Sequence, residues 1–236
     1  MIHPGCPIGL LPRETVTDAQ FDEMFSLLSR YFEGVGREQF ERDLAEKNWV
    51  VEVRRDGQLL GFTTLLVCAE EFEGCPMTAV FSGDTIVVPE AWRSPQLARS
   101  WIAAINHLRA AAPTHPCYWL LLTSGFRTYR FLPVFWRMFY PRHDAVIPER
   151  ERRLLDHLAR KKYDAAYDAA SGIVRFPNPQ RLRGALAEVP DGRLVDADVA
   201  FFLARNPGFG RGDELVCMTE ICDSNLTAAG RRMIAK

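Results

Sequence analysis

The sequence lacks the features that identify several classes of protein. No apolar run approaches the ~20 residues that a membrane-spanning helix needs. The N-terminal segment MIHPGCPIGLLPRE has neither the charged region nor the long apolar core of a signal peptide. The 29 basic and 30 acidic residues leave a formal net charge of −1, so no overall positive field attracts nucleic acid. We therefore expect a cytoplasmic protein with no stable membrane insertion and no nucleic-acid partner.

The cysteines lack the spacing of a metal site or a redox motif. None of the six forms a Cys-x-x-Cys pair, and no histidine accompanies them at zinc-ligand spacing. Several lie in apolar runs typical of strands, so we expect buried, unreactive thiols, a reducing compartment and no bound metal. The sequence also lacks a Gly-x-Ser-x-Gly elbow and a Cys-centred signature, which argues against a hydrolase.

What is present indicates a globular α/β chain. Apolar residues make up 47% of the 236 residues, enough for a large core. Thr17 and Asp18 precede an amphipathic run that predicts a capped helix, and a second helix is expected over 37–47. Two β-rich runs flank Asp56 and Gly57, which predicts a hairpin.

The remainder of the chain continues this alternation of strands and helices. MTAVFSGDTIVV predicts a long strand in which Ser82, Asp84, Ile86 and Val88 share one face. A helix is expected over 95–112 with Ser94 as its N-cap. CYWLLLTS predicts a buried strand, and Gly125 opens an aromatic helix that runs to Pro141, with a kink at Pro133 or a helix that begins near it. Later elements are a charged helix over 148–163, a strand at GIVRF, a helix over 196–204 and a final strand at DELVCMTEI.

The stretch IVVPEAWRSPQLARSWIAAINHL, in this order of elements, resembles the GNAT superfamily of N-acyltransferases. The resemblance covers residues 15–145 and implies a mixed, mostly antiparallel sheet flanked by helices. It divides the chain into a donor-binding core (1–145) and a C-terminal part (146–236) that completes the sheet. In the family, the strand end and the next loop bind the acyl donor. The matching residues here are Ile86, Val87, Val88, Arg93, Ser94, Gln96, Leu97 and Ala98.

The physical basis of such a loop is general: unpaired amides and the positive end of a helix form an anion site. Here Gln96 stands where the family has its first glycine, and Pro95 contributes no N–H. These departures fit a donor held chiefly by its pantetheine arm, as on an acyl-carrier protein. An ordinary strand-to-helix turn is the other interpretation.

The strand CYWLLLTS is the second match. In the family this strand splays from the preceding one, and the pantetheine lies in the gap, which would place Thr123 and Ser124 beside it. A tyrosine on the following helix often protonates the leaving thiolate. Trp136 aligns with that position, and Tyr129 is the nearer tyrosine to the strand end, so we predict Tyr129 as the acid. Packing in an aromatic core is the alternative.

Asp84 is the candidate general base. An aspartate within a strand is poorly tolerated unless it is paired or functional, and an amine acceptor must lose a proton before it attacks a thioester. The alternative is a structural partner of a nearby arginine or amide.

The predicted function is acyl transfer from acyl-CoA or an acyl-carrier protein to an amine of a small molecule, such as an amino acid in the N-acyl amino acid synthases of this type. The alternative is a catalytically silent module of the same fold that binds an acyl donor or a protein partner.

Overall fold

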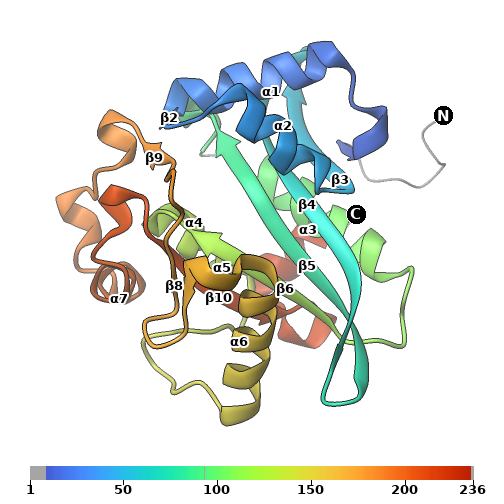
Figure 1. Cartoon of the computed structure of the whole chain (residues 1–236), viewed down its shortest axis with the longest axis vertical. Helices are drawn as coiled ribbons and strands as arrows, with labels where there is room; N and C mark the ends of the chain where they lie inside the picture. Colours follow the sequence, from blue (N-terminus) through green and yellow to red (C-terminus); the bar gives the residue numbers. More distant parts are fainter. Residues whose placement is uncertain (1–8, 93, 235–236) are drawn as a thin grey trace.

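The computed structural model describes residues 9–92 and 94–234 (Figure 1). The strands are β1 Leu10–Pro12, β2 Phe32–Glu33, β3 Trp49–Arg55, β4 Gln58–Phe72, β5 Cys75–Val87, β6 Cys117–Thr123, β7 Tyr167–Asp168, β8 Ile173–Val174, β9 Arg181–Leu182 and β10 Glu214–Glu220. The α-helices are α1 Asp18–Tyr31, α2 Arg37–Ala45, α3 Gln96–Arg109, α4 Phe126–Tyr129, α5 Phe131–Phe135, α6 Glu149–Tyr163, α7 Ala197–Arg205 and α8 Ala228–Ile234. Among the 3-10 segments, η2 Pro89–Ala91 and η4 Gly184–Leu186 border the site described below.

The main sheet has eight strands in the order β1-β3-β4-β5-β6-β10-β8-β7. β5 and β6 pair in parallel, while every other neighbouring pair is antiparallel. The predicted mixed, mostly antiparallel sheet flanked by helices is therefore confirmed. Its last three strands in this order come from the chain after residue 145, and β10 lies directly against β6.

Local sequence explains the first elements. Asp56 and Gly57 both have positive φ, 50° and 80°, as the predicted two-residue turn between β3 and β4 requires. At the start of α1, the hydroxyl of Thr17 accepts a hydrogen bond from the N–H of Gln20, and the side-chain oxygen of Gln20 accepts one from the N–H of Thr17. This capping box confirms the predicted helix start.

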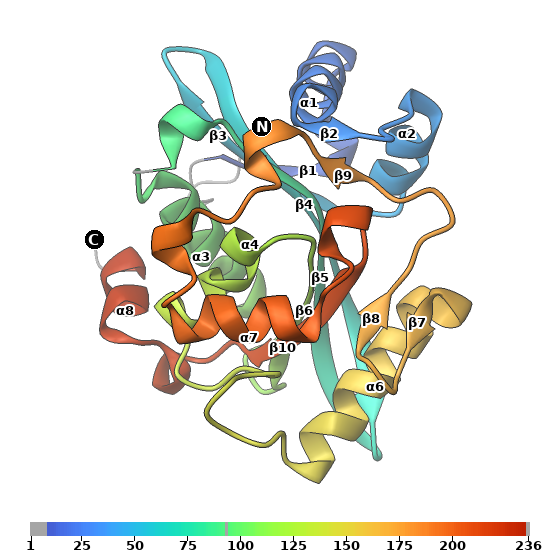
Figure 2. The ribbon, with the colours of Figure 1, turned by 90° about the vertical axis from the view of Figure 1, so that its left-hand side faces the viewer.

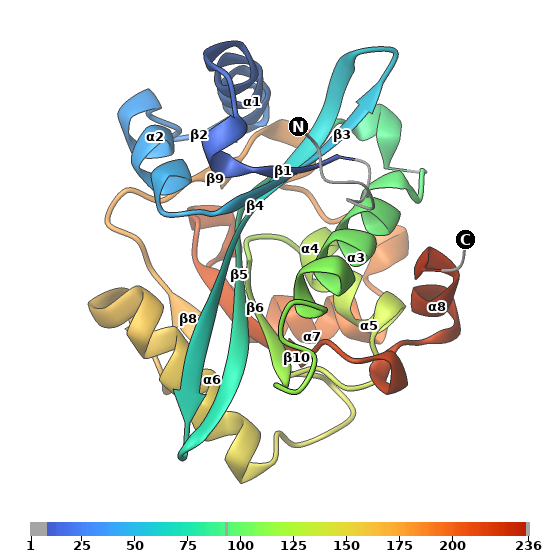
Figure 3. The same cartoon turned by 90° about the vertical axis from the view of Figure 1, so that its right-hand side faces the viewer.

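Helices cover both faces of the sheet and divide the core into three clusters (Figure 3). On one face α1 and α2 pack over Phe62 and Ile86, while α6 packs further along the same strands, over Phe81 and Leu66. Phe62 and Leu66 are four residues apart in β4 and so share a face. The opposite face carries α3, α4, α5 and α7 over a cluster that includes Trp119.

The aromatic helix predicted to run to Pro141 ends at Phe135 instead. Trp136 is already extended, with φ −122° and ψ 143°, and it forms a β-bridge with Leu226. Tyr140 forms another bridge with Met218 of β10. Pairing with the C-terminal part of the chain therefore replaces helical hydrogen bonds here, which local helical periodicity cannot indicate.

The absence of a membrane-length apolar run in the sequence has its counterpart in the structure. Among the residues that the structure describes, no helix combines the length and the hydropathy that crossing a membrane requires.

Candidate active site

β5 and β6 diverge partway along their length (Figure 1). Their parallel pairing begins at Thr78 and Cys117 and ends at Ser82 and Leu121. Beyond that point β5 stays with β4 as far as Val87, while β6 stays with β10. The two edges that face each other past Ser82 are thus not joined as a ladder. This gap, the splay, is the feature that the resemblance to the GNAT superfamily implied.

A β-bulge lies at the start of the splay. Thr63 pairs with Thr85 and Thr64 pairs with Gly83, so Asp84 is an extra residue on β5. The Thr85 hydroxyl lies 2.7 Å from the carbonyl of Gly83 and 2.7 Å from the hydroxyl of Thr63.

The bulge corrects the predicted alternation along β5. Ser82 accepts a hydrogen bond from the indole of Trp119 on the α3 side, at 3.0 Å. Ile86 and Val88 instead pack on the α1 side. The prediction that these residues share one face was wrong, because one inserted residue reverses the side of every residue before it.

Asp84 belongs to a set of polar side chains between the apolar cluster under α1 and α2 and the one under α6. We call this set the polar seam. Along β4 the face changes from Phe62 to Thr64 to Leu66, apolar to polar to apolar. The members of the polar seam are Thr64, Asp84 and Glu214 from the sheet, Lys47 after α2, Tyr163 at the end of α6, and Gln180 before β9.

Close packing at Gly83 brings two of these groups together. A Cβ on Gly83 would lie 2.8 Å from Cε of Lys47 and 2.9 Å from Oγ1 of Thr64. The Lys47 ammonium donates to the carbonyl of Asp43 at 2.9 Å. Thr64 is fully buried, and its hydroxyl has no hydrogen-bond partner in the described part of the chain. A buried hydroxyl without a partner is costly and points to a group that the site would accept.

The two carboxyl groups of the polar seam are held away from their ordinary ionisation. Burial raises the pKa of Asp84 to about 6, and the nearby charge of Lys47 opposes that rise. Burial, and secondly the charge of Asp84, raises the pKa of Glu214 to about 8. At neutral pH Asp84 is therefore largely ionised and Glu214 largely protonated. A carboxylate with a pKa near 6 is suited to accept a proton from an amine at that pH.

The ammonium of Lys47 and the phenol of Tyr163 in the polar seam are also shifted toward their neutral forms. Burial lowers the pKa of Lys47, partly offset by the charge of Asp84. Burial, with the charges of Glu214 and Glu46, raises the pKa of Tyr163. Such a cluster of shifted groups is typical of functional sites.

The loop between β5 and α3 presents few free amides. α3 begins at Gln96, one residue later than predicted, with Pro95 as its N-cap. Ser94 nevertheless accepts a hydrogen bond from the N–H of Gln96 at 3.2 Å. The side chain of Gln96 is also engaged, as a donor to the carbonyl of Arg54 at 3.1 Å. Arg93, the predicted basic residue of this loop, lies outside the described residues.

The other residues predicted to bind the acyl donor have packed side chains, so their contacts with a donor would come chiefly from the backbone. The side chains of Ile86, Val88 and Ala98 are buried, and Leu97 packs at the edge of the cluster under α1. The carbonyl of Val87 accepts a hydrogen bond from the indole of Trp92 at 2.9 Å. Their part in donor binding stays a prediction.

Arg127 links the donor loop to α4. Its guanidinium lies 4.5 Å from the ring centroid of Trp92, a cation–π contact. Because Trp92 follows β5 and Arg127 follows β6, this contact bridges the outer end of the splay.

Two predicted hydroxyls are occupied elsewhere. Thr123 is fully buried and donates to the carbonyl of Leu215 at 2.9 Å, so its hydroxyl is not available to a donor. Tyr129 is also fully buried and donates to the carbonyl of Pro141 at 3.0 Å. Burial raises its pKa, which disfavours ionisation of the phenol. This geometry favours the packed-core alternative for Tyr129. Ser124, directly after β6, is half-buried.

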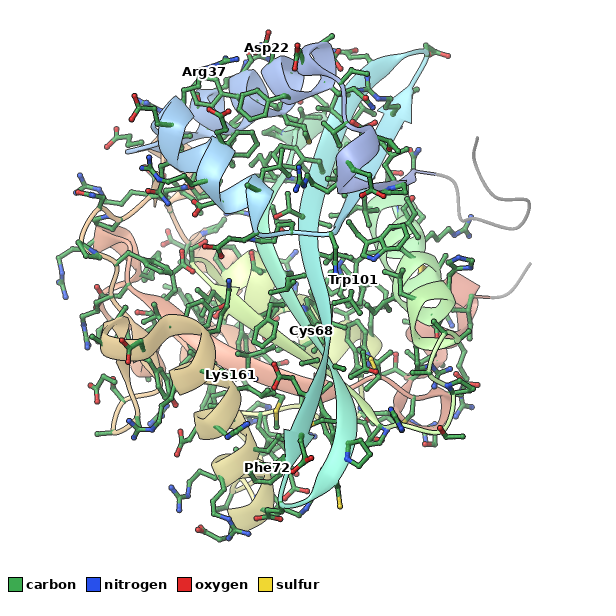
Figure 4. All side chains as sticks on the ribbon, turned by 45° about the vertical axis from the view of Figure 1, so that its right-hand side comes forward. Asp22, Arg37, Cys68, Phe72, Trp101 and Lys161 are labelled. Carbon is green, nitrogen blue, oxygen red and sulfur yellow. The ribbon has the colours of Figure 1, made fainter. Side chains whose placement is uncertain are left out.

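The acidic hairpin between β4 and β5 is ion-paired to α6. Glu73 pairs with Arg153 at 2.6 Å. Glu70 pairs with Lys161, which is labelled on α6 in Figure 4. The basic face of α6 is thus an ion-paired structural surface. Cys117 and Cys217 are buried with pKa values raised to about 12, as expected of unreactive thiols, whereas Cys75 is exposed.

Sequence reasoning missed Lys47, Thr64, Tyr163 and Glu214. Each comes from a different element, and none belongs to a motif with fixed spacing. Glu214 gave a weak signal, because it is an acidic residue directly before the apolar run of its strand. The rest required the packing of α2 and α6 on the sheet.

No protein-family model matches the chain, and no curated protein sequence does. Solved structures with a similar course of chain include a probable N-acyltransferase of unknown function from Enterococcus faecalis, at 12% identity and a TM-score of 0.42 over 87% of this chain. The match spans 64% of that protein, less than two thirds of its length.

Two further similar structures are a GNAT family N-acetyltransferase from Escherichia coli in complex with CoA and a GNAT family acetyltransferase from Brucella melitensis in complex with acetyl-CoA. The first has 16% identity over 56% of this chain and 71% of that one, with a TM-score of 0.37. The second has 16% identity over 47% and 73%, with a TM-score of 0.34. At these values the likeness concerns the fold alone.

The order of elements, the parallel β5–β6 pair and its splay agree with the arrangement that the sequence resemblance implied.

Proposed function

We propose that this protein transfers an acyl group from a thioester donor to the amine of a small molecule. The observation that carries the proposal is the position of Asp84, a carboxylate on the bulge where β5 separates from β6. A pantetheine arm in the splay would deliver its thioester to the polar seam. Asp84 lies at that point with a pKa of about 6.

In this reaction Asp84 accepts a proton from the protonated amine, and the amine nitrogen attacks the thioester carbonyl. The new C–N bond forms as the C–S bond breaks. The ammonium loses two protons: Asp84 accepts the first and releases it to solvent, and the second leaves the nitrogen as the C–S bond breaks and protonates the departing thiolate. General base catalysis of this kind contributes about 10²–10⁴-fold in rate.

The acceptor we propose carries an anionic group beside its amine, as an amino acid does. Lys47 supports this, because its ammonium makes no ion pair with any described residue and its pKa is lowered chiefly by burial. Asp84, ionised at neutral pH, supplies the complementary negative charge of the polar seam.

The donor we propose is held mainly through its pantetheine arm, on CoA or on an acyl-carrier protein. Pro95 contributes no amide at the start of α3, and the N–H of Gln96 is already engaged by Ser94. These features leave fewer backbone amides at the start of α3 to bind the pyrophosphate of CoA. The reaction needs no metal in this scheme.

The test measures donor binding first and turnover second. The protein is mixed with acetyl-, medium-chain and long-chain acyl-CoA and with an acyl-carrier protein, and bound donor is detected by native mass spectrometry and thermal shift. A donor at ~100 times its dissociation constant adds about 2.7 kcal/mol of stability. Turnover with amino acids then compares the wild type with Asp84→Asn, which should bind donor normally and lose about 100-fold or more in kcat. No binding of any donor would exclude the proposal.

A silent donor-binding module is the second candidate, favoured by the engagement of Tyr129 with Pro141. It predicts donor binding without turnover for any amine.

A further inference from the structure

Residues 177–187 form a segment that we call the strap, and one side of it is attached to the end of α1. β9 within it pairs with β2, with Leu182 opposite Phe32 and Arg181 opposite Glu33. The N–H of Arg183 donates to the carbonyl of Tyr31 at 2.8 Å. Figure 2 shows β9 beside β2, with the orange chain on either side of it crossing this side of the molecule.

The strap also touches both strands of the splay. The side chain of Gln180 is within hydrogen-bonding reach of Asp84 on β5. Cδ1 of Leu182 lies 3.2 Å from the position that a Cβ on Gly125 would take, and Gly125 directly follows β6. Residues 180–182 therefore connect the two diverging strands, a span of about 7 Å for two extended residues. A further contact joins Arg127 to the carbonyl of Leu186 at 2.9 Å.

A pantetheine arm in the splay would need the space at its mouth that the strap occupies. One surface cleft lies beside this region, bordered by Tyr31, to which the strap is attached, and by Val88 and Glu90 after β5; another is bordered by His115 and Glu220. Between Asp84 and Gly125 the strap itself lies across the splay.

The strap is attached by a short ladder and by separate side-chain contacts, among them Arg183 to the carbonyl of Phe32 at 3.0 Å and to Glu33 at 3.6 Å. Its ladder with β2 is two residues long, and most of its side chains are exposed or half-buried. Gly184 has φ +51°, with nothing within 4 Å of its Cβ position, so the chain can pivot there without a steric clash. Segments with short ladders and little apolar burial open at a small fraction of the global unfolding free energy.

We propose that the strap is a gate of the acyl-transfer site: it leaves the mouth of the splay to admit the donor arm and returns, with Gln180 against Asp84, once the arm has left. This inference rests on the proposed function, because it requires a donor that enters the splay.

The first test locks the strap with a reversible disulfide. Glu33 and Arg181 face each other across the ladder, and both side chains are exposed, so Glu33→Cys with Arg181→Cys leaves the core intact. The background carries Cys75→Ser to remove an exposed thiol. Each single cysteine variant is the control. Donor affinity is measured by calorimetry with the oxidised and the reduced protein.

We expect the oxidised form to bind the best acyl donor at least tenfold more weakly, and reductant to restore the wild-type affinity. Equal affinity of the two forms would overturn the gate and leave the proposed function intact. Failure of the wild-type protein to bind any donor would overturn both.

A second variant tests the gate without a disulfide. Leu182→Ala removes the side chain that meets Gly125, and because Leu182 is only half-buried the fold should tolerate it. If the strap must open before the donor binds, this variant should bind donor severalfold more tightly, since less of the protein is in the closed state. Weaker binding would show that Leu182 is part of the donor site, which contradicts the gate.

Discussion

The carboxyl groups of Asp84 and Glu214 belong to the same polar seam, although β6 separates their strands in the sheet. The splay makes this possible, since β5 moves away from β6 where Asp84 lies. Two carboxyl groups in one enclosed place cannot both ionise easily, so each influences the proton of the other. The site therefore contains one ionised and one protonated carboxyl group at neutral pH.

Glu214→Gln should stabilise the protein at high pH. The folded-state pKa of Glu214, about 8, lies above the unfolded value near 4.3, so ionising Glu214 costs stability as the pH rises between these values. The variant has no such charge, so its free energy of unfolding relative to the wild type should rise by a few kcal/mol between pH 5 and pH 9. At pH 5 the difference between the two proteins should be small. An equal gain at both pH values would show that the charge is not the cause.

Lys47→Met should move the acid limb of the pH–rate profile to higher pH. The ammonium of Lys47 lowers the pKa of Asp84, so its removal lets that pKa rise above about 6. Because Asp84 acts in its ionised form, turnover at pH 6 should fall more than turnover at pH 8. Lys161→Met, which removes an exposed cation paired with Glu70, is the matched control and should leave the profile unchanged. If the acid limb of the pH–rate profile does not shift in Lys47→Met, either Asp84 is not the general base or the charge of Lys47 does not act on it.

The two buried tyrosines should respond differently to loss of the hydroxyl. Tyr129→Phe removes a hydrogen bond to Pro141 and should cost about 1 kcal/mol of stability with turnover nearly unchanged. Tyr163→Phe removes a phenol of the polar seam that its raised pKa keeps protonated; because this phenol would pass a proton to the leaving thiolate, its loss should lower kcat by about tenfold or more. Unfolding curves and steady-state kinetics of both variants separate the roles. A folded but inactive Tyr129→Phe protein would restore Tyr129 as the acid.

Gly83→Ala should damage the site by overpacking. The added Cβ would stand 2.8 Å from Cε of Lys47 and 2.9 Å from the hydroxyl of fully buried Thr64. Thr64 cannot retreat, so we expect a loss of about 1–3 kcal/mol and a displaced Lys47. Gly57→Ala offers a comparison at a turn where the cost is one of backbone conformation, because nothing lies near its Cβ position. Unchanged stability in Gly83→Ala would mean that Lys47 moves aside freely.

The sequence by itself determined the elements that depend on nearby residues. The capping box at Thr17 and Gln20 set the start of α1, and Asp56 with Gly57 set the turn between β3 and β4. Apolar periodicity placed α2, α3, α6, α7 and the central strands, and the loop between β5 and α3 pointed to the fold. These features follow from hydrogen bonds and side-chain spacing within a few residues, which are visible in one stretch of sequence.

Only the tertiary structure decided the composition of the site. The bulge at Asp84 depends on the register of β4 against β5, and it moved Ser82 to the opposite face from Ile86. Trp136 is extended rather than helical, because it forms a β-bridge with Leu226, which lies far along the chain. Lys47, Tyr163 and Gln180 reach Asp84 and Glu214 because α2, α6 and the strap pack over one gap between two apolar clusters. Contacts between segments this far apart in the chain arise from packing, and no local pattern of residues records them.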